Sequence, residues 1–192
     1  MEVIYKVVNI EGKGSGCVAL QDLKKGTLVL DEKPQCVAKK HPDGSRDLKS
    51  VIQSFAHMSK NDQEEYLKLY MQYQNLVEVP DSWKIIYSLL DSETEKNLDS
   101  SNGVISEFVH NFMEEKQKGY QRFVDIIGIY NTNCFENGLG IKTARFNHSC
   151  CSNANAYWNK EDNKTEIRVV SKIKAGHSAL KFEKECNLEM LH

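Results

Sequence analysis

The spacing of apolar residues changes twice along the chain, and each change marks a different kind of predicted structure. The first part alternates short β-rich runs with clusters of turn residues, a pattern that predicts a small antiparallel β-unit. Pro34 marks its end, because proline cannot donate a hydrogen bond to a sheet. The predicted strands are residues 3–8, 17–20 and 27–30, and the predicted turns are residues 12–16 and 24–26.

Helical spacing begins after Arg46. The apolar side chains of Leu48, Val51, Ile52, Phe55 and Met58 recur every three or four residues, which predicts a first helix. A second predicted helix follows a plausible N-cap in residues 59–62 and extends to Tyr73. Two further predicted helices cover residues 83–90 and 104–127, with a loop at residues 99–103 between them.

Strand patterns return after Gly128. Residues 154–158 and 165–170 flank a polar stretch, which predicts a hairpin with a longer loop, and residues 174–176 form another turn. A β-unit is thus interrupted by helices and completed by a second β-unit. The predicted fold class is α+β, mainly β, with small antiparallel sheets split by a helical insertion.

Composition narrows the protein class. The chain has 192 residues, of which 40% are apolar and 27% charged, as in a soluble domain with one real core. The net charge of -2 gives no electrostatic signature of nucleic-acid binding. No signal-peptide pattern and no apolar run of membrane-spanning length occurs, so we expect an intracellular protein, nuclear or cytoplasmic, without direct nucleic-acid or membrane partners. Its six cysteines include no Cys-x-x-Cys pair, which favours reduced thiols.

The most informative segment is residues 145–154, Arg-Phe-Asn-His-Ser-Cys-Cys-Ser-Asn-Ala. Polar or sulfur-bearing residues follow one another without interruption from Asn147 to Cys151, which suits neither a buried strand nor an amphipathic helix. The segment is therefore either a functional site or a solvated loop. The glycine-rich turn and the Asn-Cys-Phe at residues 133–135 favour a site.

Together these segments resemble SET-domain protein lysine methyltransferases, especially the SET-and-MYND and fungal types. The resemblance rests on residues 12–16 with 22–26, on residues 133–135 and on residues 145–154, and residues 58–67 add to the likeness with the fungal type. It implies a SET-domain β-clip, S-adenosylmethionine as cofactor, and a lysine of a histone or another protein as substrate. Oligomeric state is left open.

The resemblance also assigns residues to the methyl donor. It implies that backbone groups of Lys13, Gly14 and Ser15 hold the donor, and that Gly16 shapes the turn. Alone, a Gly-x-Gly-x-Gly run is more often a hairpin turn. The family further implies donor contacts from Asn147, His148 and Asn133, although Asn133 is equally well explained as a turn residue, while Phe135 and Phe146 are expected in the core.

The C-terminal part departs from the family pattern. The predicted SET domain covers residues 1–182, in parts 1–40, 41–127 and 128–182, and an atypical tail covers 183–192. Relatives continue the turn at residues 174–176 with Glu-Glu-x-Thr-x-x-Tyr, whose tyrosine completes the methyl-transfer pore. Here that position is Glu183, beside Phe182, so no catalytic residue is assigned. The tail resembles a shifted or alternatively spliced end, and the alternative function is a catalytically inactive SET-derived binding module or truncated isoform.

Metal binding is not expected. In many relatives the cysteine at the position of Cys150 binds zinc together with three later cysteines, but only Cys186 lies downstream here. Two thiols do not make a tetrahedral zinc site, so we predict none, with Cys150 and Cys151 as one packed and one partly exposed thiol. No cysteine lies between Cys36 and Cys134, so a MYND finger is not predicted there.

Overall fold

The computed structural model divides the chain into two compact units. One comprises Met1–Pro34 and Gly140–His192, and the other comprises Gln35–Leu139. The first unit is therefore built from both ends of the chain and the second from its middle. The structure describes residues 3–11, 14–69, 71, 81, 83–85, 87–88, 116–149 and 151–177, with the backbone alone for residues 116–118.

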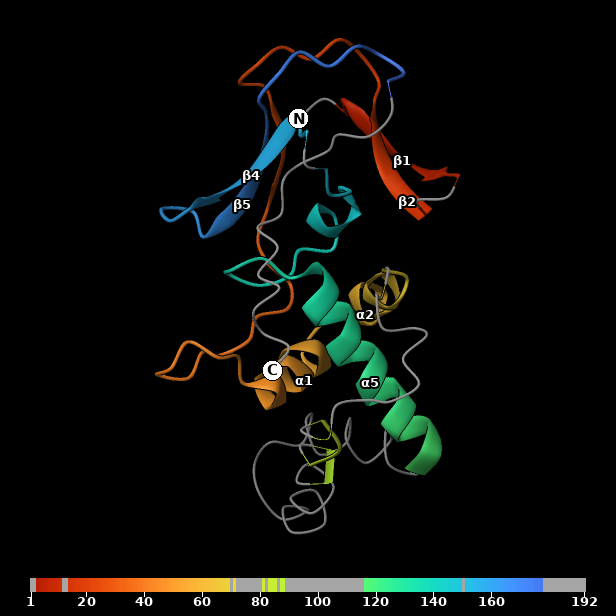
Figure 1. The fold of residues 1–192 in the computed structure, drawn as a ribbon, viewed down its shortest axis with the longest axis vertical. Coiled ribbons are helices and arrows are strands. Elements are labelled where there is room, and N and C mark those ends of the chain that lie inside the picture. Colours follow the sequence, from red (N-terminus) through yellow and green to blue (C-terminus); the bar gives the residue numbers. More distant parts are fainter. Residues whose placement is uncertain are drawn as a thin grey trace. The chain divides into compact units, whose positions relative to one another are not determined.

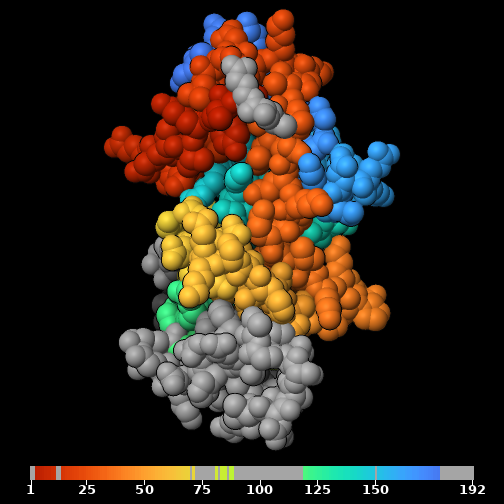
Figure 2. Space-filling model, turned by 180° about the vertical axis from the view of Figure 1, so that it is seen from behind, coloured from red at the N-terminus to blue at the C-terminus, as the bar shows by residue number. Residues whose placement is uncertain are grey.

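The first unit begins with a two-stranded antiparallel sheet (Figure 1). Strand β1 (Tyr5–Ile10) pairs with β2 (Gly14–Ala19), and Gly16 lies opposite Val8. The turn predicted at residues 12–16 is too long, because its second half belongs to β2. Gly14 starts the strand with a φ of 67°, which glycine adopts without strain, and ladder pairing then outweighs the low strand propensity of glycine. The surface of this hairpin is exposed in the view of Figure 2.

The second sheet joins strands from both ends of the chain. Its order is β3-β5-β4, and both pairings are antiparallel, with β3 at Leu28–Glu32, β4 at Ala154–Asn159 and β5 at Lys164–Val169. The predicted hairpin of β4 and β5 is confirmed. Alternate residues of β5 are buried, including Ile167 and Val169, so one face of this strand contributes to the core.

Two turns of the first unit lie beside each other. The backbones of Leu23 and Ile173 exchange hydrogen bonds of 2.8 and 3.0 Å, and the Asp22 carboxylate accepts a 3.0 Å bond from the N–H of Ala175. This N–H and the nearby Lys172 lower the pKa of Asp22. The predicted turns at residues 24–26 and 174–176 are thus held together from opposite ends of the chain.

The second unit is helical. Helices α1 (Leu48–Ala56) and α2 (Lys60–Leu67) both pack against α5 (Lys116–Asn133), as Figure 1 shows. Ser59 caps α2 as predicted, because its hydroxyl accepts a 3.1 Å bond from the N–H of Asp62. The α+β class, with small antiparallel sheets and inserted helices, is confirmed.

Helix α5 ends later than the sequence pattern indicates. The prediction ended the helix at residue 127, before Gly128, whereas the helix continues to Asn133. A glycine inside a helix costs about 1 kcal/mol, but Ile129 and Tyr130 are both almost fully buried here, and their packing outweighs that cost.

Other predicted helices are only partly described. Residues 83–85, 87 and 88 are helical, in agreement with the helix predicted there, while residues 104–115 lie outside the described residues. Within the part of the chain that is described, no helix has the length and apolar character needed to cross a membrane.

Candidate functional site

The polar segment after Phe146 forms the loop between a short 3-10 turn and β4. The turn, η1, covers Thr143–Arg145, and β4 begins at Ala154. Inside the loop the Ser149 hydroxyl accepts a 3.2 Å hydrogen bond from the N–H of Cys151. Among the described residues of this segment, none belongs to a helix or to one of the strands, as its unbroken run of polar residues indicated.

Asn147 lies directly against Gly16 of β2. A Cβ atom at Gly16 would fall 2.7 Å from the Asn147 Nδ2 and 2.5 Å from the Ile10 Cδ1, closer than such atoms approach each other in proteins. A larger residue at position 16 would displace the ends of these two side chains, so the close approach, and not an unusual φ, favours glycine here. Two of the predicted site residues, far apart in sequence, are brought into contact.

The side-chain amide of Asn147 has an unused donor. Its Nδ2 is buried and has no hydrogen-bond partner among the residues that the structure describes. An unpaired buried donor costs about 1–3 kcal/mol, so a partner is strongly favoured. The acceptor must come either from a segment outside the described residues or from a bound molecule.

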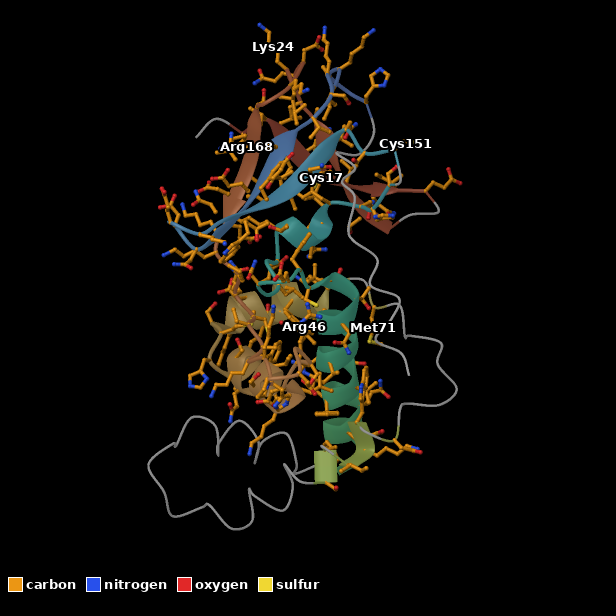
Figure 3. The ribbon with its side chains drawn as sticks, turned by 60° about the vertical axis from the view of Figure 1, so that its left-hand side comes forward. Cys17, Lys24, Arg46, Met71, Cys151 and Arg168 are labelled. Carbon is orange, nitrogen blue, oxygen red and sulfur yellow. The ribbon has the colours of Figure 1, made fainter. Side chains whose placement is uncertain are left out.

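Two contacts with the β1-β2 sheet fix the residues before Asn147. The Cys17 thiol donates a 3.5 Å hydrogen bond to the carbonyl oxygen of Arg145, and the rings of Tyr5 and Phe146 lie 5.3 Å apart. Phe146 is buried, as predicted for a core residue. Burial raises the pKa of both Cys17 and Tyr5 to about 12, so both side chains stay uncharged at neutral pH. Cys17, which is labelled in Figure 3, belongs to β2 of the first unit.

Glu32, which was not among the predicted site residues, holds the start of η1. Its carboxylate is buried and accepts bonds of 3.0 Å from the Lys142 N–H, 2.8 Å from the Thr143 N–H and 2.7 Å from the Thr143 hydroxyl. Its backbone pairs with Thr165 in the sheet. One feature of the sequence could have identified Glu32: it is an acidic residue at the end of a strand, two positions before Pro34, and in the structure it lies on a buried position of that strand.

The remaining predicted site residues of the first unit lie in β2 and in the loop after Asn147, except for Lys13. Gly14 and Ser15 lie in β2 beside Gly16, and His148 is exposed in the loop after Asn147. Lys13 lies outside the described residues. Their contacts with a ligand stay predictions.

Asn133 belongs to the second unit. It is the last residue of α5, not a turn residue, and its side-chain amide donates a 2.8 Å hydrogen bond to the carbonyl oxygen of Ile129. This bond gives Asn133 a structural role at the end of the helix. Its part in a site with Asn147 stays a prediction.

No cluster of three or more His, Cys, Asp or Glu side chains suited to a metal ion occurs among the described residues. Cys150 and Cys186 lie outside them, as do Phe182 and Glu183 near the expected tyrosine position. The predictions of no zinc and of no pore tyrosine are therefore untested. Cys151 is exposed, as predicted for one thiol of the pair.

The residues near Asn147 fit a polar ligand such as S-adenosylmethionine. Gly14 of β2 has open space beside its backbone, and the Asn147 amide offers a hydrogen-bond donor that the described residues do not use. A ligand with a carboxylate and an adenine ring could supply an acceptor for this donor.

Comparisons with known proteins identify the family and the fold of the chain. The family model described as "SET domain" matches residues 14–178. Among curated proteins, none matches the chain significantly. A solved SET domain of LSMT bound to lysine and AdoHcy is similar over 97% of this chain and 50% of its own, with 14% identity and a TM-score of 0.56. Rubisco LSMT bound to AdoMet is similar over 97% of this chain and 49% of its own, with 16% identity and the same TM-score of 0.56. The chain thus spans about half the length of these structures, and at such identities the likeness establishes the fold alone.

Proposed function

Because the chain belongs to the SET-domain family, we propose that it is a protein lysine methyltransferase that uses S-adenosylmethionine as its methyl donor. The observation that carries the proposal is the unpaired Nδ2 of Asn147, buried against Gly16 at the place where the family motif predicts donor binding. Solved structures with the same fold contain AdoMet, or AdoHcy together with lysine, which supports the choice of donor and of substrate side chain.

Each predicted residue has a specific task in this proposal. The backbone of Gly14 and Ser15, with Lys13 before them, lies along the donor, and Gly16 leaves room for Asn147. The Asn147 side chain donates a hydrogen bond to the donor, and His148 adds a second polar contact. Asn133 is proposed as a further donor contact.

The reaction proposed is a direct displacement. A neutral lysine amine attacks the methyl carbon, the carbon–sulfur bond breaks with its electron pair going to sulfur, and S-adenosylhomocysteine leaves. The amine then loses a proton to water. The protein needs only to orient the two reactants and to favour the uncharged amine, and a narrow, poorly hydrated channel does both.

We further propose that the substrate lysine belongs to a histone or another protein and that the protein acts inside the cell. The near-neutral net charge favours recognition by local contacts over a general attraction to nucleic acid. Histones and an array of lysine peptides are therefore the first substrates to test.

Transfer of tritium from S-adenosyl-[methyl-³H]methionine tests the proposal. Incorporation into a lysine side chain that Asn147→Ala abolishes and Asn159→Ala preserves is the expected result. Asn159 is a matched control, because it is an asparagine of the same unit whose hydrogen bonds lie in the β4-β5 turn.

A folded chain that binds the donor without transferring methyl groups would instead be a SET-derived binding module, the alternative left open by the sequence near Glu183. A folded chain that neither binds the donor nor transfers methyl groups, assayed beside an active relative, would reject the proposal.

A further inference from the structure

We propose that Glu32 is a positioning residue for the methyl-donor site: its carboxylate clamps the start of η1 and thereby fixes Asn147 against Gly16. This inference rests on the proposed function. It concerns a residue that no family motif identified, and it follows from the contacts on both sides of η1.

The first step is the clamp itself. Both carboxylate oxygens of Glu32 point at the η1 backbone: Oε1 accepts a 3.0 Å bond from the Lys142 N–H, and Oε2 accepts from the N–H and hydroxyl of Thr143 at 2.8 and 2.7 Å. The first N–H groups of a helical turn have no partners within the turn, and an acidic group is the preferred acceptor there. Glu32 thus satisfies the N–H and hydroxyl of Thr143, a fully buried residue whose donors would otherwise have no partner in the turn.

The second step is the shape of the chain around the clamp. A Cβ atom at Gly140 would lie 2.4 Å from Glu32 Oε2 and 3.1 Å from Thr143 Oγ1, so a side chain there would push the carboxylate away. The Gly140 carbonyl oxygen accepts a 2.9 Å bond from the N–H of Ala144. Gly140 therefore makes room for the clamp and also belongs to the turn that the clamp holds.

The third step is the short distance along the chain from the clamp to Asn147. η1 has only three residues, Thr143–Arg145. Glu32 of the β3-β5-β4 sheet holds its beginning. In the β1-β2 sheet, Cys17 bonds to its last residue, Arg145, and Tyr5 contacts Phe146, the residue that follows it. A turn fixed at both ends leaves Asn147, two residues beyond it, little freedom, whereas a turn released at its beginning lets Asn147 move away from Gly16.

The test is calorimetric titration of the intact chain with S-adenosylhomocysteine, in wild type, Glu32→Gln and Asp31→Asn. Glutamine keeps the shape of Glu32 but replaces one acceptor oxygen with an NH₂ group that faces a backbone N–H. If the loop then keeps its binding geometry about a tenth of the time, the apparent Kd rises about tenfold. Asp31→Asn is the matched control, because Asp31 is the neighbouring residue of β3 and pairs with Lys164 away from η1. Its Kd should equal that of wild type.

Hydrogen exchange adds a readout that does not depend on donor binding. Glu32→Gln should speed amide exchange in residues 142–149 and leave β4 and β5 unchanged, whereas general destabilisation would speed exchange in the strands as well. If Glu32→Gln fails to fold, Thr143→Val removes only the hydroxyl bond to Glu32 and should give the same local change, smaller in size.

The outcomes separate this inference from the proposed function. Wild-type affinity in Glu32→Gln, or unchanged exchange in residues 142–149, overturns the positioning role. A wild-type chain that does not bind the donor overturns the proposed function, while faster exchange confined to residues 142–149 in Glu32→Gln would still support the clamp.

Discussion

At the scale of single residues, Asn147 combines two properties that conflict in the ligand-free protein. Its Nδ2 atom is buried, and the described residues offer it no acceptor. Gly16, which lies opposite, leaves just enough space for this atom. If its acceptor is a bound ligand, as proposed, this donor lowers the stability of the ligand-free protein by about 1–3 kcal/mol. A residue kept for folding alone would show the opposite pattern.

Asn147→Ala therefore has a distinctive expected result. Donor affinity should fall at least about tenfold, while the free energy of unfolding of the ligand-free chain should stay the same or rise by about 1 kcal/mol, because a buried unpaired group is removed. Denaturant titration and calorimetry measure the two quantities. Asn159→Ala should leave donor affinity unchanged and lower the free energy of unfolding. It loses a 2.9 Å hydrogen bond to Glu166 and a 3.0 Å hydrogen bond from the N–H of Glu161. Loss of stability in Asn147→Ala comparable to that in Asn159→Ala would contradict this account.

The described cysteines should differ sharply in reactivity. Cys17 and Cys36 are buried, and burial raises the pKa of each to about 12, whereas Cys151 is exposed on the loop, as Figure 3 shows. Because the thiolate is the reactive form, iodoacetamide at about pH 8 should alkylate Cys151 long before Cys17 or Cys36. Peptide mass spectrometry after timed quenching measures this order. Equal rates for Cys17 and Cys151 would show that Cys17 does not have the burial described.

The same pKa shift has a consequence for stability. The ordinary thiol pKa is 9.0, and the folded value for Cys17 is about 12, so the folded state holds this proton more tightly than the unfolded state does. The contribution of the protonated Cys17 thiol to the free energy of unfolding is complete below pH 9 and is lost as the pH rises towards 12. Cys17→Ser should therefore reduce the loss of stability at alkaline pH.

At the scale of elements, the turn between β4 and β5 has the clearest conformational requirement. Asn163, directly before β5, has a φ of 52°, a left-handed conformation that asparagine tolerates and most other residues do not. Asn163→Ala should lower the free energy of unfolding by about 1 kcal/mol, and Asn163→Gly should retain wild-type stability within about 0.5 kcal/mol. Urea denaturation measures both, and equal stability of the Ala and Gly variants would contradict a positive φ at this position.

The elements themselves were mostly predictable from periodicity, and the errors have local causes. Helical spacing located α1 and α2, and strand patterns located β4 and β5. The end of α5 was predicted too early, just before Gly128, because helix propensity does not include the packing of Ile129 and Tyr130. The partner of β3 was not predictable, since pairing with β5 depends on contacts between the two ends of the chain.

At the scale of the whole molecule, the resemblance to the SET family is confirmed, and it was visible in the glycine-rich strand and the Asn-His motif. The sequence predicted that Gly16 and Asn147 belong to the same site, but it did not predict that they touch. Glu32 was not predicted as a site residue, because no sequence motif marks a buried carboxylate in a strand. Its role depends on hydrogen bonds to η1, which form only in the folded chain. Sequence motifs thus identified residues proposed to touch the donor, but not the residue proposed to hold them.

The most direct test of the central claim is calorimetric titration of the folded wild-type chain with S-adenosylhomocysteine. We predict saturable binding of one ligand per chain, a rise in melting temperature with ligand concentration as linkage requires, and loss of both in Asn147→Ala. A wild-type chain that melts cooperatively yet gives no binding heat and no shift in melting temperature would contradict the claim that Asn147 and Gly16 form a methyl-donor site.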